Sequence, residues 1–173
     1  MKIFGIVGWK NNGKTTLMTR LIRILTERGY SVSTIKHAHH AFDVDQPGKD
    51  SHRHREAGAR EVLVGSAARW ALIHELRDEA EPALDALIPK LAPVDILLIE
   101  GFKQHGHMKL EVVLKEGRRD PLIAEKDSNV VALASNDPDL GSPRDLPLLP
   151  LDAPEVIADF ILRQTGLRQE VTS

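Results

Sequence analysis

Residues 8–15 constrain this chain more than any other part of it. They read Gly8-Trp9-Lys10-Asn11-Asn12-Gly13-Lys14-Thr15 and match the phosphate-binding pattern G-x-x-x-x-G-K-[ST]. An apolar run at residues 2–7 precedes them, and a helical pattern from Thr16 to Arg28 follows. Such a loop functions only between a strand and a helix N-terminus, so this context supports the motif. An ordinary glycine-rich turn is the alternative.

Each part of the loop has a physical role in holding a nucleotide. Gly8 and Gly13 let backbone N–H groups turn inward around phosphate oxygens, and the helix dipole attracts the anion. Lys14 can reach the terminal phosphates, and the Thr15 hydroxyl can ligate Mg²⁺. The predicted nucleotide-binding residues of this segment are Gly8, Trp9, Lys10, Asn11, Asn12, Gly13, Lys14, Thr15 and Thr16.

The rest of the chain alternates predicted strands with predicted helices. This alternation predicts an α/β fold of the P-loop NTPase type, with a mainly parallel sheet flanked by helices and some antiparallel strands. We expect one domain over residues 1–173. The expected strands are 2–7, 30–35, 60–64, 70–73, 94–100, 110–114 and 130–134, and the expected helices are 16–28, 52–59, 82–91 and 154–165.

Four finer expectations follow from local sequence. The strands at 60–64 and 70–73 form a hairpin around Gly65-Ser66. The alternating segment 110–114 predicts an edge or half-exposed strand, and the Pro-rich segment 138–150 predicts irregular structure. The segment Asp152-Ala153-Pro154-Glu155 predicts a capped helix start, with Asp152 as the cap.

Composition narrows the classes of function. The chain has 173 residues, and its 23 basic and 25 acidic residues give a net charge of -2, so we expect no nucleic-acid or membrane partner. Cysteine is absent, which excludes disulfides and thiolate metal sites. The N-terminus lacks a signal-peptide pattern and leads directly into a predicted strand. Cytoplasm is the expected location.

Glu100 is the candidate acidic group beside the metal. It ends the apolar run at residues 94–99, and Gly101 allows backbone to approach a phosphate closely. We predict Glu100 as the catalytic residue, and Thr15 and Glu100 as magnesium ligands. A strand-end carboxylate with a structural role is the alternative. Asp95, at the other end of the same run, is expected to cap or to face solvent.

A second concentration of reactive groups follows the second predicted strand. Five of the eight histidines lie between His37 and His54, together with Asp43, Asp45 and Asp50. We predict a ligand-facing switch loop in which Asp45 approaches Mg²⁺. A transition-metal site and a solvated polar loop are the alternatives.

Recognition of the base is less defined by the sequence. Asn136 and Asp137 follow the strand at 130–134, where guanine-binding proteins place an Asn/Thr-Lys-x-Asp element, and only half of that element is present. A carboxylate accepting from guanine is one interpretation, and a plain turn is the other. Trp9 is a candidate shield for the nucleotide or a partner surface. Trp70 is expected in the core.

Four segments together resemble one family. They are Gly8 to Thr16, Lys36 to Ser51, Ala57-Gly58-Ala59, and Glu100-Gly101-Phe102-Lys103. Over roughly residues 1–165 the chain resembles the molybdopterin-guanine dinucleotide biosynthesis adapter family (the MobB type). The resemblance implies a dimeric P-loop domain that binds GTP with Mg²⁺ and hydrolyses it slowly. It also implies assistance to the guanylyltransferase that joins GMP to molybdopterin, with molybdopterin itself as a second candidate ligand.

Within this resemblance, Asp45 and Glu100 are candidates beside the metal and the phosphate. Trp9 occupies the position where related dimeric ATPases carry an extra signature lysine, so a lysine reaching a second nucleotide is not expected. Two other functions stay open. One is a small-metabolite kinase, for which Arg118, Arg119 and Asp120 are candidates, and the other is a metal-insertion GTPase suggested by the histidines.

Overall fold

The computed structural model describes residues 1–38, 42–117 and 121–167, and the chain divides into two compact units. The first unit comprises Met1–His37 and Pro89–Ser173, and the second comprises Ala38–Ile88. The expectation of one domain over the whole chain stays a prediction.

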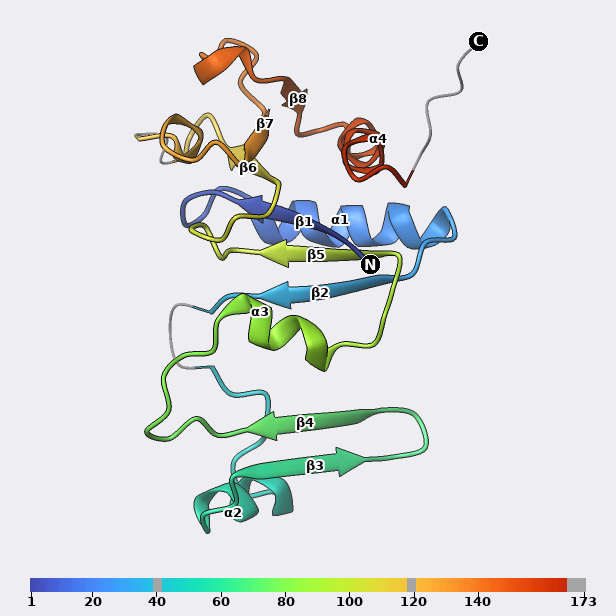
Figure 1. Cartoon of the computed structure of the whole chain (residues 1–173), viewed down its shortest axis with the longest axis vertical. Helices are drawn as coiled ribbons and strands as arrows, with labels where there is room; N and C mark the ends of the chain where they lie inside the picture. The colour runs from blue at the N-terminus through green and yellow to red at the C-terminus, as the bar shows by residue number, and fades with distance from the viewer. Residues whose placement is uncertain (39–41, 118–120, 168–173) are drawn as a thin grey trace. The chain divides into compact units, whose positions relative to one another are not determined.

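The first unit is built on a six-stranded parallel sheet with the order β2-β5-β1-β6-β7-β8 (Figure 1). All of its strand pairs are parallel. The sheet confirms the predicted fold class. Its strands are β1 (Lys2–Val7), β2 (Val32–Lys36), β5 (Ile96–Glu100), β6 (Lys109–Val113), β7 (Val130–Ser135) and β8 (Leu148–Pro150).

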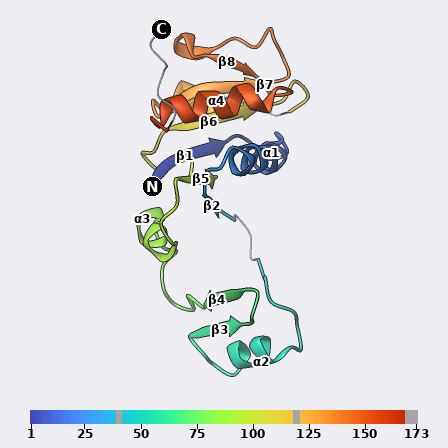
Figure 2. The same ribbon diagram turned by 90° about the vertical axis from the view of Figure 1, so that its right-hand side faces the viewer.

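Two helices cover one face of this sheet. α1 (Lys14–Glu27) and α4 (Pro154–Gln164) pack against each other beside the strands (Figure 2). Leu17, Leu21 and Leu25 of α1 are buried in this layer, so the helical pattern predicted from Thr16 to Arg28 places an apolar face against the sheet. A smaller cluster on the other face includes Val7, Val113 and Leu133, and it packs against η2 (Ile123–Glu125) and its neighbours.

The strand register brings the predicted site to one level of the sheet. Glu100 pairs with Ile6 of β1 on one side and with Lys36 of β2 on the other. Because the strands are parallel, the loop after β1 and the residues that end β2 and β5 meet at the same carboxyl edge.

The second unit contains an antiparallel hairpin. β3 (Glu61–Gly65) pairs with β4 (Trp70–His74) through a turn in which the Ser66 N–H donates to the Arg69 carbonyl. α2 (Asp50–Glu56) packs against β3. α3 is only Leu84–Leu87 and continues as the 3₁₀ turn η1 (Ile88–Lys90), shorter than the predicted helix because Pro89 has no N–H to continue it.

The prediction of an edge or half-exposed strand at 110–114 was wrong. β6 lies between β1 and β7, and all five of its residues are buried. Glu111 gave segment 110–114 its alternation, and β6 also contains Lys109, but both charged residues are satisfied inside the protein. Lys109 Nζ lies 2.7 Å from Asp127 Oδ2, and the Glu111 carboxylate accepts the Ile123 and Ala124 N–H groups at 2.9 and 2.8 Å.

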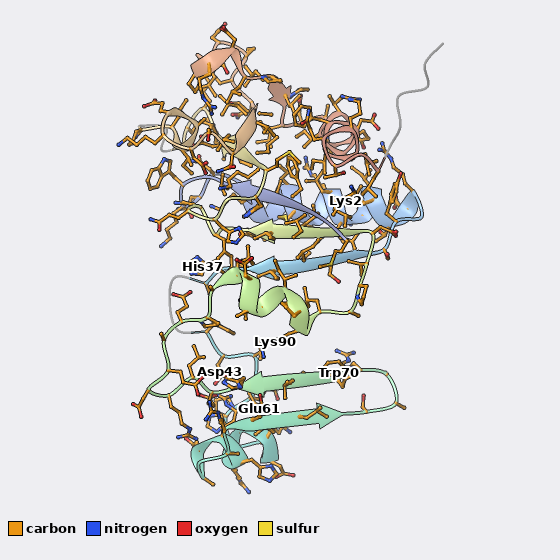
Figure 3. All side chains as sticks on the ribbon, viewed as in Figure 1. Lys2, His37, Asp43, Glu61, Trp70 and Lys90 are labelled. Atoms are coloured by element: carbon orange, nitrogen blue, oxygen red, sulfur yellow. The ribbon has the colours of Figure 1, made fainter. Side chains whose placement is uncertain are left out.

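Three further expectations were wrong. The segment 138–150 contains η3 (Pro143–Asp145) and strand β8, which pairs with β7. Helix α4 has Ala153 at its N-cap and no side-chain cap, so Asp152 does not cap it. Trp70 is 67% exposed at the turn end of β4 rather than in the core (Figure 3), because it lies on the hairpin face that it shares with the exposed Leu63 and Leu72.

In the described part of the chain, the helices fall short of the length and apolar character that crossing a bilayer requires.

Candidate functional site

The loop between β1 and α1 has the backbone that a phosphate cradle requires. Gly8, Asn11 and Gly13 have φ values of 146°, 65° and 78°. A Cβ at Gly8 would lie 2.6 Å from the Val112 carbonyl oxygen, so a side chain there would collide with β6. Helix α1 begins at Lys14, which puts its free N–H groups at the loop.

The loop is held from outside by the segment that follows β6. Asn12 is fully buried, and its Oδ1 accepts the Leu114 N–H at 3.2 Å. The Trp9 indole Nε1 donates to the Pro121 carbonyl at 2.8 Å. These two contacts give Asn12 and Trp9 structural roles in fixing the loop.

Lys14 lies within this cradle. Its Nζ donates to the Trp9 carbonyl oxygen at 2.8 Å. Burial lowers the pKa of Lys14, the negative charge of Glu100 opposes this shift, and the charges of Lys103 and Lys36 add to it. The site therefore concentrates positive charge around a lysine that the sequence assigns to the terminal phosphates.

Thr15 and Glu100, the two magnesium ligands predicted at this edge, lie in contact, and their metal roles stay predictions. The Thr15 hydroxyl donates to Glu100 Oε1 at 3.0 Å, and Glu100 itself is buried. Lys36 Nζ lies 3.7 Å from the same oxygen. A hydroxyl and a carboxylate are hard oxygen ligands of the kind Mg²⁺ prefers, so the residues present fit this ion.

A cavity of about 300 Å³ lies beside the loop and the start of α1. Its lining includes the predicted residues Gly13, Thr16 and Asn136, and it extends to the residues that follow β8. The full lining is Gly13, Thr16, Leu17, Arg20, Leu114, Asn136, Leu151 and Asp152.

Asn136 and Asp137 are placed differently. Asn136 lines the cavity, and its Oδ1 accepts the Lys115 N–H at 2.8 Å. The Asp137 carboxylate is nearly buried, accepts the Asp139 N–H at 3.3 Å and lies 3.5 Å from Lys115 Nζ. Both base-recognition assignments stay predictions.

Asp45 belongs to the second unit and has partners there. Its Oδ1 accepts from the Ser51 hydroxyl at 2.8 Å, and its Oδ2 lies 3.3 Å from Arg55 Nη1. The Ser51 hydrogen bond is the main cause of the lowered pKa of Asp45. Arg55 also pairs with Asp43 and Glu75, so this network ties the segment before α2 to the helix and to the end of β4. The magnesium role of Asp45 stays a prediction.

The histidine-rich segment yields no cluster of three or more metal-ligating side chains among the residues that the structure describes. His39 and His40 lie outside the described residues, as do Arg118, Arg119 and Asp120 of the kinase alternative.

Two lysines of the site had no binding role predicted from the sequence. Lys36 ends β2, and Lys103 Nζ lies 4.1 Å from the centre of the Trp9 ring. Lys103 belongs to the segment Glu100-Gly101-Phe102-Lys103, which is part of the family resemblance. That resemblance was the feature of the sequence that could have indicated a role for Lys103 in the site.

The parallel sheet, its strand order and the loop between β1 and α1 define a protein of the P-loop NTPase class. A family model described as Molybdopterin guanine dinucleotide synthesis protein B matches residues 3–136. The chain belongs to this family.

Known proteins agree with this assignment. A molybdopterin-guanine dinucleotide biosynthesis adapter protein of Escherichia coli (strain K12) is 39% identical over 165 residues, covering 92% of this chain and 91% of the relative. One from Haemophilus influenzae is 38% identical over 161 residues, covering 92% and 86%. The crystal structure of Bacillus subtilis MobB has a TM-score of 0.78 at 29% identity and covers 95% of this chain and 98% of that one.

Proposed function

We propose that this chain is a GTP-binding adapter of molybdenum cofactor biosynthesis that holds Mg²⁺-GTP and hydrolyses it slowly at most. The curated relatives are named adapter proteins of molybdopterin-guanine dinucleotide biosynthesis, which supports a role in this pathway. The proposed partner is the guanylyltransferase that joins GMP to molybdopterin, with molybdopterin as a second candidate ligand. The proposed location is the cytoplasm.

One observation carries the nucleotide part of this proposal. The Thr15 hydroxyl and the Glu100 carboxylate are in hydrogen-bond contact at the end of the phosphate-binding loop. In P-loop proteins such a pair holds the magnesium ion that bridges the two outer phosphates. When bound, the ion neutralises phosphate charge. Lys14 and the loop amides supply the remaining positive potential.

The cavity beside α1 is the proposed binding site for the base of the nucleotide. It lies next to Gly13 and Thr16, so a nucleotide whose phosphates follow the loop would direct its base toward Asn136. The choice of guanine over adenine rests on the family, because Asp137 pairs with Lys115.

We expect slow hydrolysis from the charged groups around the proposed phosphate site. Phosphoryl transfer is catalysed mainly by stabilising charge in the transition state, and an arginine finger accounts for much of the rate in fast GTPases. Among the residues that the structure describes, the charged groups that shift the pKa of Lys14 are Glu100, Lys103 and Lys36, and Arg20 lies at the cavity. We expect the partner enzyme to accelerate turnover only if it supplies such an arginine.

We also propose that the chain forms a homodimer through the β3–β4 hairpin. Leu63, Trp70 and Leu72 share one face of the hairpin, because Leu63 is opposite Leu72 and Trp70 lies two residues along β4. Their exposed fractions are 65%, 67% and 45%. An apolar face of this kind is typical of a protein interface.

Calorimetry with GTP and ATP, with and without Mg²⁺, tests the nucleotide part of the proposal. Wild type is expected to bind GTP more tightly with Mg²⁺ than without it, and more tightly than it binds ATP. Lys14→Ala should weaken GTP binding at least ~10-fold, and Glu100→Gln should abolish the magnesium effect, because each removes a charged contact. Absence of binding to folded wild type would refute the nucleotide proposal.

The adapter role has its own test. A tagged wild-type chain should co-purify with the guanylyltransferase, and the complex should raise dinucleotide synthesis above that of the transferase alone. If the chain binds GTP but neither co-purifies with the transferase nor raises dinucleotide synthesis, the nucleotide proposal stands and the adapter role is refuted.

A further inference from the structure

The residues after Glu100 form a strained turn back toward the phosphate-binding loop. Gly101 and Phe102 have consecutive positive φ values of 94° and 48°, and the second is unusual for a side chain of this size. The Gly101 N–H donates to the Ile6 carbonyl at 3.1 Å. The His37 ring stacks on Phe102 with 4.6 Å between ring centres, which holds the turn in this conformation.

This turn brings Lys103 to the loop. Lys103 Nζ lies 4.1 Å from the centre of the Trp9 ring, while Lys14 Nζ bonds to the carbonyl of the same tryptophan. The Lys103 backbone is fixed as well, because its carbonyl accepts a hydrogen bond from the buried Lys109 Nζ at 3.0 Å. Two ammonium groups from different elements therefore approach one residue of the loop.

We infer that Lys103 binds the terminal phosphate of the nucleotide, moving from the Trp9 ring to the phosphate when a triphosphate is bound. This inference rests on the proposed function and extends it to a recognition residue for the third phosphate. Strained backbone is retained where a functional geometry requires it, and here it directs a cation at an anion-binding loop.

The order of groups along the site indicates that Lys103 would contact the terminal phosphate rather than the inner ones. The cavity proposed for the base lies at Gly13 and Thr16. The Thr15 and Glu100 pair would hold the magnesium ion, whose charge would offset that of the outer phosphates. Lys103 follows Glu100 by three residues and contacts Trp9, near the start of the loop and away from the cavity lining.

The charge of the site agrees with this role. The charges of Glu100, Lys103 and Lys36 all act on Lys14, and Lys36 Nζ lies 3.7 Å from Glu100 Oε1, so among these four described residues three ammonium groups face one carboxylate. The surplus of positive charge matches a magnesium-bound triphosphate better than a diphosphate. Lys103 then supplies from this chain part of the charge that an arginine finger supplies elsewhere.

Calorimetry with Mg²⁺ and either GTP or GDP tests the inference in the full chain. Wild type should bind GTP more tightly than GDP. Lys103→Met, which keeps the length of the side chain and removes its charge, should weaken GTP binding at least ~10-fold while changing GDP binding less than ~3-fold. Lys103→Arg should restore most of the preference. Lys126→Met is the matched control, because Lys126 is an exposed lysine of the same unit near the amino end of β7.

Trp9 gives a second readout. The chain has two tryptophans, so Trp70→Phe leaves Trp9 as the only fluorophore of this kind. Its emission should respond more to GTP than to GDP, and Lys103→Met should remove that difference. Equal losses of GTP and GDP affinity in folded Lys103→Met, no loss at all, or a wild type that binds both equally would overturn the inference. No binding of either nucleotide to wild type would instead refute the proposed function.

Discussion

At the scale of single residues, Lys14 should make nucleotide binding depend on pH. Burial lowers its pKa below the ordinary value of 10.5 in the nucleotide-free protein. A bound phosphate favours the charged form and so raises this pKa, which means that binding takes up a proton at alkaline pH. Affinity for GTP should therefore be constant at low pH and fall as pH rises from the lowered pKa toward 10.5 and above.

Calorimetry in buffers with different ionisation enthalpies measures this proton uptake directly. Lys14→Arg, whose guanidinium stays protonated, is the control and should show no uptake from this position. Equal affinity across the alkaline range in wild type would contradict the expectation.

His107 should make stability depend on pH on the acid side. Burial, with the charge of Lys109, lowers its pKa from 6.5 to about 4, and its buried Nε2 has no hydrogen-bond partner among the described residues. The unfolded chain therefore binds a proton that the folded protein does not, as pH falls from 6.5 toward 4. Because the ring is partly exposed, the free energy of unfolding should fall by only ~1–2 kcal/mol over this range.

Urea unfolding at several pH values measures this effect. His107→Asn should show a smaller decrease than wild type between pH 6.5 and 4. An identical decrease in both proteins would assign the acid sensitivity to other groups.

At the scale of elements, β6 is tied to the loop after β5 by Lys109. This buried ammonium binds the Lys103 and His105 carbonyls and the Asp127 carboxylate. Lys109→Met would leave these three acceptors without their ammonium donor. The substitution should therefore lower the free energy of unfolding by ~2–4 kcal/mol. Lys2→Met, at the exposed start of β1, should change it by less than ~0.5 kcal/mol.

Chemical denaturation of the two variants provides the measurement. Lys109→Met should also reduce the preference for GTP over GDP, because it releases the loop that presents Lys103. A variant of wild-type stability would show that the ion pair contributes nothing net to folding.

Sequence alone predicted the elements whose signals are local. The motif at residues 8–15 and the helical pattern of the next segment predicted β1, the loop and α1, and the strand-end position predicted that Glu100 lies at the carboxyl edge of the sheet, where Thr15 contacts it. β6 was assigned wrongly because Glu111 resembles a solvent-facing residue in the alternating segment 110–114. The two N–H groups that the Glu111 carboxylate accepts follow 12 and 13 residues later, and local alternation carries no information about them.

The turn that presents Lys103 was also beyond local patterns. A phenylalanine rarely adopts positive φ, so nothing in the letters after Glu100 specified a reversal of the chain. The same holds for Trp70, whose apolar character indicated burial while the hairpin exposes it. Exposure of this kind depends on which elements pack against a face of the strand. The residue pattern of a strand does not specify those elements.

At the scale of the whole molecule, the hairpin face should determine the oligomeric state. Leu63→Glu would place a carboxylate in the proposed interface, where burying it without a partner is costly, and should raise the dimer dissociation constant at least ~100-fold. Val156→Glu is a matched control, because Val156 is an exposed apolar residue on α4. Light scattering after size-exclusion chromatography measures both. A monomeric wild type, or a dimeric Leu63→Glu, would refute this interface.

The buried ammonium group of Lys109 holds residues 103–105 in place and should limit the access of solvent to their backbone. The His105 N–H donates to the Phe102 carbonyl at 3.1 Å inside a loop that Lys109 fastens at both Lys103 and His105. Deuterium should therefore replace this amide proton slowly for a loop position, even in the absence of nucleotide. The protein would then meet its ligand with this segment already in place, and little entropy would be lost there on binding.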